Sequence, residues 1–307
     1  AALYDTVRAV ALELCPALGI GVPVGKDSLS MRTRWDDQQV TAPVSLIVSA
    51  FAALDDVRGT LTPQLQPVDS TLILVDLGQG RMRMGGSMLA QCQGRFGDSA
   101  PDLDDAAALK SLVAAINELR GAGQILAYHD RSDGGLWAAV CEMAFAGQRG
   151  VSLNVDLLVT ESDGIGDSRA EYGDSKNWAA QIGERRNELT LKALFNEELG
   201  VLLQVPRAQR DAVIATLRKH GLGRCSHAIG KTNDKRIVEV WRDAKAVFSA
   251  PLRDLQQVWD EVSWRIARLR DNPGCADAEH AAAGADGDTG LHLHLSFDPA
   301  EAPAVFK

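Results

Sequence analysis

A polar, glycine-containing segment near the middle of the chain carries residue types suited to binding phosphate and metal. The segment HDRSDGG (residues 129–135) directly follows the apolar stretch QILAY and directly precedes LWAAVCEMAFAG. Asp130 can offer a hard oxygen to Mg²⁺, which proteins usually hold through one or two carboxylates together with phosphate and water. Ser132 can donate to a phosphate, and the two glycines would let a ligand approach the first turn of the following helix. The alternative is that Ser132 and Asp133 only cap that helix.

A second candidate segment, GKDSLSM (residues 25–31), combines a cation, a carboxylate and a hydroxyl in Lys26, Asp27 and Ser28. These groups can face an anionic or metal-bound ligand. The segment fits neither of two common nucleotide motifs, because the glycine spacing is one residue late for GxGxxG and Asp27 stands where a P-loop has Ser or Thr. The alternative is an ordinary charged turn.

A third segment, GRMRMGGSMLAQ (residues 80–91), places Gly85, Gly86 and Ser87 before a short predicted helix. A phosphate can bind the exposed N–H groups of such a turn, with Arg81 and Arg83 close by. The alternative is a tight connection between a strand and a helix.

A fourth segment, FNEELG (residues 195–200), sets Asn196, Glu197 and Glu198 at a helix end before a buried strand. Paired carboxylates can hold a metal ion. Solvated charges at a helix end are the alternative.

The elements that must position these segments follow from hydrophobic periodicity. A helix is predicted over residues 4–18, and the β-branched segment VTAPVSLIVSAFAALDDV predicts one central strand covered on both faces. Further strands are predicted over 71–77, 124–129, 151–155, 199–205, 224–229 and 236–241, and further helices over 86–93, 103–120, 133–146, 190–197, 206–219 and 253–270. This alternation predicts an α/β or α+β layered domain.

Proline and glycine punctuation divides the chain into three regions. A boundary near residues 61–68 separates a region at 1–62 from a larger domain at 63–270. Residues 160–187, inside the larger domain, are expected to form a surface insertion loop. Residues 271–307 are expected to form a linker that ends in a short strand, where His292 and His294 are interpreted as exposed residues rather than metal ligands.

Charge, hydropathy and cysteine spacing argue against a nucleic-acid-binding, membrane-spanning or disulfide-bonded protein. The formal net charge is −9, so no overall positive field would attract nucleic acid or an anionic membrane. The longest apolar stretch, residues 44–54, falls short of the ~20 residues needed to span a bilayer. Five scattered cysteines without CxxC spacing are typical of reduced thiols, which favours a cytoplasmic location.

The motifs GKDSLSM, GGSMLAQ, HDRSDGG and FNEELG, in this order, resemble phosphoribosylformylglycinamidine synthase in its large single-chain form. That family belongs to the aminoimidazole ribonucleotide synthetase superfamily, in which a smaller ferredoxin-like domain precedes a larger α/β domain. The resemblance implies that residues 1–62 are the C-terminal part of the smaller domain and that residues 63–270 are the larger one. The chain resembles the second of two such units only, followed by a linker toward a glutaminase domain.

The resemblance also implies an activity and a site. The family consumes ATP and glutamine to convert formylglycinamide ribonucleotide into its amidine in purine biosynthesis. It assigns Asp130 as a Mg²⁺ ligand and Asp130 and Ser132 as contacts to ATP or ADP, at a site regarded as auxiliary. The implied partners are the first synthetase-like unit and the glutaminase domain of the same chain, so the 307-residue piece alone is expected to be inactive.

Two other interpretations remain open. The chain can be a structural assembly module without ligand affinity, or another ATP-dependent enzyme of the superfamily, such as a selenophosphate synthetase or a thiamine-phosphate kinase. Apolar surface and strand edges left exposed in the smaller domain also predict self-association.

Overall fold

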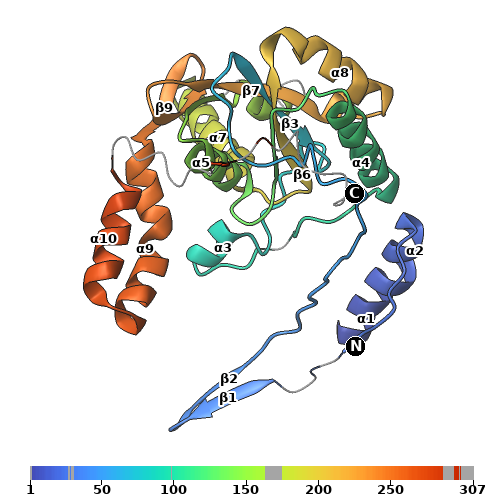
Figure 1. Ribbon diagram of the computed structural model, residues 1–307, viewed down its shortest axis with the longest axis vertical. Helices are drawn as coiled ribbons and strands as arrows, with labels where there is room; N and C mark the ends of the chain where they lie inside the picture. The colour runs from blue at the N-terminus through green and yellow to red at the C-terminus, as the bar shows by residue number, and fades with distance from the viewer. Residues whose placement is uncertain are drawn as a thin grey trace.

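A seven-stranded sheet forms the centre of the molecule (Figure 1). The computed structural model describes residues 2–26, 28, 31–97, 99–162, 175–285, 294–296 and 298. The strand order is β4-β6-β3-β7-β5-β8-β9, and all neighbours are antiparallel except β5 and β8. The strands are β3 (Ser70–Asp76), β4 (Ala127–Asp130), β5 (Gly150–Asn154), β6 (Gly200–Pro206), β7 (Ser226–Asn233), β8 (Ile237–Arg242) and β9 (Lys245–Pro251).

Helices cover both faces of this sheet, because its central strands are apolar on both sides. In β3, Leu72 and Leu74 enter one core while Ile73 and Val75 enter the other, as alternating side chains must. The first core includes residues of α5 (Gly135–Gly147), α6 (Asp156–Ser162), α7 (Ser175–Phe195) and α9 (Leu252–Arg270). The second includes residues of α4 (Ala106–Gly121) and α8 (Arg210–Lys219). The expected layered α/β class is therefore confirmed.

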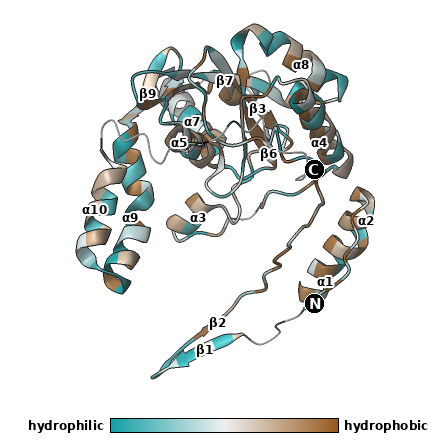
Figure 2. Ribbon diagram, in the orientation of Figure 1, coloured by the Kyte–Doolittle hydropathy of each residue, from teal (hydrophilic) through white to brown (hydrophobic). Residues whose placement is uncertain are grey.

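The N-terminal region differs from the sequence-based expectation. It contains one helical stretch, built of α1 (Ala2–Val7), a π-helix (Arg8–Leu14) and α2 (Cys15–Leu18), and a hairpin of β1 (Arg32–Trp35) and β2 (Gln38–Thr41). The strand expected in VTAPVSLIVSAFAALDDV is wrong beyond Thr41, since residues 42–57 form no strand. Ile47 and Phe51 there are 90% and 94% exposed, along the extended segment that Figure 2 shows leaving the body. A strand needs pairing neighbours, and within the described residues this segment has none.

Two further expectations are corrected. The surface loop expected at 160–187 is wrong in part, because α6 reaches Ser162 and α7 begins at Ser175, rich in good helix formers; residues 163–174 lie outside the described part. The linker expected from 271 begins with α10 (Pro273–Ala283), capped by Asn272, whose side chain accepts from Cys275 N. α10 packs along α9, and Trp264 stacks on His280 with ring centroids 4.4 Å apart.

The end of the chain is described only in part. The strand expected at 291–297, with His292, lies mainly outside the described residues, and His294 is exposed. The sequence also missed β9, which pairs with β8. In the part of the chain that the structure describes, no helix is long and apolar enough to cross a membrane.

Candidate functional site

Asp130 and Ser132 lie at the exit of the edge strand β4, and both side chains are exposed. The Tyr128 hydroxyl donates to Asp130 Oδ1 at 2.5 Å. Burial of the ring, and then this contact with Asp130, raise the pKa of Tyr128 above its ordinary value, so the phenol stays protonated as a donor. One oxygen of Asp130 remains without a protein partner among the described residues, and it is available to a ligand.

The turn after Ser132 is closed by glycine and not by a side-chain cap. Gly134, with φ +79°, is the N-cap residue of α5 and, as a glycine, makes no side-chain capping hydrogen bond. The alternative that Ser132 and Asp133 cap the helix is therefore wrong. A Cβ on Gly135, which has φ +67°, would lie 2.5 Å from the carbonyl oxygen of Asn196. This glycine permits close packing against the end of α7 rather than access for a ligand.

Glu197 joins three of the four motifs. Its Oε1 accepts hydrogen bonds from Gly134 N in HDRSDGG and from Met88 N in GGSMLAQ, each at 2.8 Å. Glu197 itself belongs to FNEELG. Its carboxylate therefore fixes the first turns of α5 and of α3 (Met88–Cys92) to the same point.

The expected phosphate contacts at Gly85, Gly86 and Ser87 are corrected by these bonds. The N–H groups of Gly85 and Gly86 donate to Ser99 O and Phe96 O, both at 2.6 Å. Ser87 is buried, and its Oγ caps α3 by accepting from Ala90 N at 3.2 Å. Because backbone oxygens already accept the N–H hydrogen bonds of Gly85 and Gly86, this turn is a tight structural connection leading into α3 and not a phosphate site.

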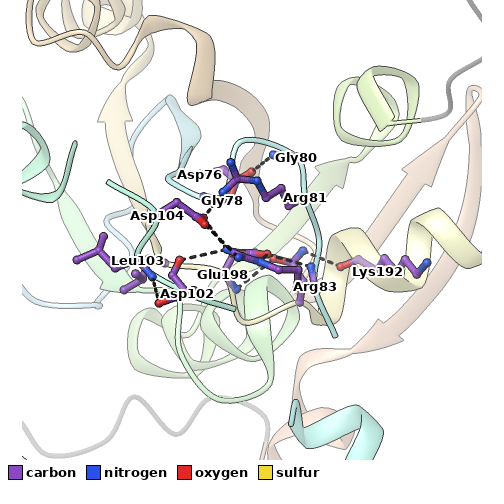
Figure 3. Close-up of polar contacts among 12 residues, drawn as sticks. Asp76, Gly78, Gly80, Arg81, Arg83, Asp102, Leu103, Asp104, Lys192 and Glu198 are labelled. Atoms are coloured by element: carbon purple, nitrogen blue, oxygen red, sulfur yellow. Dashed lines mark hydrogen bonds and ion pairs between the residues drawn. The ribbon is translucent and has the colours of Figure 1, made fainter. Parts of the chain in front are cut away.

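The arginines of GRMRM form ion pairs and are not free for phosphate (Figure 3). Arg83 Nε donates to Glu198 Oε1 and Arg83 Nη2 donates to Glu198 Oε2, both at 2.7 Å. Arg83 and Arg81 both pair with Asp104. Hydrogen bonding from Arg83 lowers the pKa of Asp104, and Glu198 and Asp104 raise the pKa of Arg83. Both interpretations of FNEELG are wrong for Glu198, which neither faces solvent nor is free for a metal.

A second buried ion pair lies beside the Arg83–Glu198 pair, and the sequence analysis did not predict it. Arg131, inside HDRSDGG, pairs with Asp76 at the end of β3 and donates from Nε to Glu198 O at 2.5 Å. Asp76 also accepts from the N–H groups of Gly78 and Gly80, at 3.1 and 2.8 Å. The sequence did contain a signal for this pair: Asp76 ends the apolar run TLILVD. A charge at the end of a buried strand needs a partner of opposite charge.

The described residues of GKDSLSM are not brought to the turn that carries Asp130 and Ser132. Lys26 and Ser28 are exposed and hydrogen bond to each other, between α2 and the hairpin. Asp27 lies outside the described residues. Figure 1 shows the hairpin that follows extending away from the layered body.

The expected Mg²⁺ ligand, Asp130, has no grouped metal-ligating side chains around it in the part of the chain that the structure describes. Within the described ranges, no three His, Cys, Asp or Glu side chains are grouped so that they could hold a metal ion. A single carboxylate such as Asp130 can bind Mg²⁺ only where phosphate and water oxygens supply the other ligands.

Several solved structures are similar to this chain. The Thermotoga maritima PurL complexed with ATP is 13% identical, with a TM-score of 0.43, and the match covers 63% of this chain and 26% of that one. PurL complexed with FGAR is 15% identical, with a TM-score of 0.44 and coverage of 65% and 30%. The E. coli hydrogenase maturation protein HypE is 19% identical, with a TM-score of 0.37 and coverage of 59% and 48%. The chain thus spans between a quarter and a third of the PurL chains.

Family models match at the level of sequence. Residues 1–53 match the FGAR-AT PurM_N-like domain, and residues 68–243 match the C-terminal domain of AIR synthase related proteins. The second match covers more than half of the chain, and the first confirms the resemblance found in the four motifs. The chain belongs to the AIR synthase related family, with an FGAR-AT PurM_N-like domain at residues 1–53.

Proposed function

We propose that this chain is a segment of an FGAR amidotransferase, the ATP- and glutamine-dependent ligase that forms formylglycinamidine ribonucleotide in purine biosynthesis. The pair of family models, found in this order, supports the proposal. In the proposed enzyme a first synthetase-like unit and a glutaminase domain supply catalysis and ammonia, in the cytoplasm. The present segment contributes an auxiliary nucleotide site and a scaffold, and is inactive alone.

The observation that best supports the proposed site is the pair of hydrogen bonds that Glu197 Oε1 accepts. By holding Gly134 N and Met88 N, it fixes the turn from which Asp130 and Ser132 face solvent. Within the described residues Ser132 Oγ has no protein partner and can donate to a phosphate oxygen, and Asp130 offers a carboxylate oxygen. Mg²⁺, when bound, would screen the phosphate charge at this edge of the sheet.

Calorimetric titration of the 307-residue chain with ADP and Mg²⁺ tests the site. We expect saturable binding that weakens about tenfold or more in Asp130→Asn and in Ser132→Ala, since each loses a direct contact worth at least ~1.4 kcal/mol. Asp55→Asn is the matched control, because it removes an exposed carboxylate elsewhere. Equal affinities in all four proteins would refute the site assignment.

A second candidate function is a structural assembly module without ligand affinity. It is favoured by the ion pairs of Arg81 with Asp104 and of Arg83 with Glu198, because these charges are then not available to a ligand. It is also favoured by the exposed apolar segment 42–57, which would suit a covering unit or a second copy of the chain. A flat titration of the wild-type chain would support this function. A sedimentation experiment that shows only monomer at high concentration would count against self-association.

A further inference from the structure

A polar cavity of about 450 Å³ lies at the other end of the sheet from Asp130. It opens where β3 begins, at Ser70, whereas Asp76 at the far end of β3 contacts Arg131 beside the candidate site. The end of β7 and the turn after it form another part of the wall. Its volume falls within the range of sites for small molecules, roughly 300–1,000 Å³.

Positive charge is concentrated at this cavity in a chain whose net charge is −9. Four cations line it, against two carboxylates: Arg149, Arg207, Lys231 and Lys235, with Asp69 and Asp234. Arg149 pairs with Asp234 at 2.9 Å, whereas Arg207 and Asp69 are 3.8 Å apart, at the margin of an ion pair. Within the described residues, Lys231 and Lys235 have no ion-pair partner. The cavity therefore holds an uncompensated positive field, which favours an anion.

Within the described residues, the hydroxyls of Ser70 and Thr232 in the wall leave one hydrogen-bond donor without an acceptor. Ser70 is 2% exposed, and its Oγ accepts from Gln204 Nε2 at 2.8 Å. Ser70 Oγ and Thr232 Oγ1 are 3.3 Å apart, and either can be the donor. Whichever donates, the other hydroxyl keeps its hydrogen for an acceptor outside the pair. An oxyanion in the cavity would provide that acceptor.

We propose that this cavity binds a small phosphate-bearing molecule, whose phosphate oxygens accept from Lys231, Lys235 and the Ser70–Thr232 hydroxyl pair. The site is separate from the proposed nucleotide site and needs no divalent metal, because the protein itself supplies the cations. Asn233 and Ser152 already bond to each other at 3.0 Å and so shape the wall.

The test is calorimetric titration of the 307-residue chain with inorganic pyrophosphate, without Mg²⁺ and at low ionic strength. We expect saturable binding that weakens at least about tenfold in the double variant Lys231→Gln/Lys235→Gln, because both are direct charged donors. Thr232→Val should weaken binding by a smaller factor. Asp130→Asn should bind pyrophosphate as the wild type does, which separates this site from the nucleotide site.

The matched control is Lys110→Gln/Lys245→Gln, which removes the same charge from exposed positions outside the cavity wall. Circular dichroism confirms that each variant is folded. Absence of saturable binding at millimolar pyrophosphate would overturn the proposal. So would an equal loss of affinity in the control, or equally tight binding of sulfate and citrate, because the site would then attract charge without selecting phosphate.

Discussion

The guanidinium of Arg83 and the carboxylate of Glu198 form a two-point ion pair, with both N–O distances at 2.7 Å. Arg83 N also donates to Glu198 Oε1 at 3.0 Å, so the carboxylate fixes both the backbone and the side chain of the arginine. The Glu198 side chain is 1% exposed. A carboxylate this deeply buried depends on its partner, which makes the pair a structural element of the corner.

Arg83→Met should therefore be strongly destabilising. Removing the guanidinium leaves the buried carboxylate of Glu198 uncompensated, and we expect the free energy of unfolding to fall by roughly 3–5 kcal/mol. Urea unfolding followed by circular dichroism measures the change. Arg265→Met is the control, because it breaks an exposed i,i+4 pair with Glu261 and should cost under about 1 kcal/mol. Similar losses in the two variants would show that the Arg83 pair is not structurally important.

Glu197 gives a second prediction, since one carboxylate oxygen accepts two backbone N–H groups. In Glu197→Ala both N–H groups lose their acceptor, and we expect the free energy of unfolding to fall by about 1–3 kcal/mol. Hydrogen exchange at Met88 and Gly134 should quicken together. Glu197→Gln keeps a carbonyl oxygen and should restore part of the protection. Faster exchange at only one of the two amides would contradict the shared contact.

The strands and helices of the layered core were predictable because apolar runs and helical periodicity are local patterns in the sequence. The apolar runs predicted as strands within residues 71–241, such as TLILVD in β3, all form strands, and the helices predicted at α4, α5, α8 and α9 were confirmed to within a few residues. By contrast, the strand expected across Ile47 depended on neighbours that the described chain does not supply. A run of β-branched residues indicates that a segment can form a strand, but not whether another strand lies beside it.

The candidate site was predictable in its position but not in its contacts. HDRSDGG does join a strand to a helix, and Asp130 and Ser132 are exposed there. Sequence alone could not show that Arg83 pairs with Glu198, 115 positions later, because only the folded sheet brings these residues together. The sequence analysis placed Arg81 and Arg83 near a bound phosphate because their acidic partners are distant in the sequence. In the structure both arginines form ion pairs.

Acid should weaken the link between α4 and α8. Glu118 accepts from Lys219 at 2.8 Å and contacts His220 at 2.8 Å, and these bonds hold the pKa of Glu118 below its ordinary value of 4.5. Because the folded-state pKa is the lower one, the stabilisation is complete above pH 4.5 and is lost as the pH falls through the folded pKa. Glu118→Gln should therefore be less stable than the wild type at pH 7, and the difference should disappear in strong acid.

Urea unfolding of both proteins between pH 3 and 7 checks this dependence, with Asp55→Asn as the control for loss of an exposed carboxylate. A difference between Glu118→Gln and the wild type that stays constant over the range would exclude the ionised carboxylate as its cause.

Two glycines with the same backbone conformation should respond differently to alanine. Gly123 and Gly135 have φ of +66° and +67°, so alanine costs about 1–2 kcal/mol of conformational energy at either position. A Cβ at Gly123 meets nothing within 4 Å, whereas one at Gly135 would lie 2.5 Å from Asn196 O and 2.8 Å from Leu194 O. We expect Gly135→Ala to lower the free energy of unfolding by about 1–3 kcal/mol more than Gly123→Ala does, because backbone must move to make room. Thermal unfolding of the two variants measures this difference. Equal losses would mean that the turn after Ser132 is not packed against the end of α7.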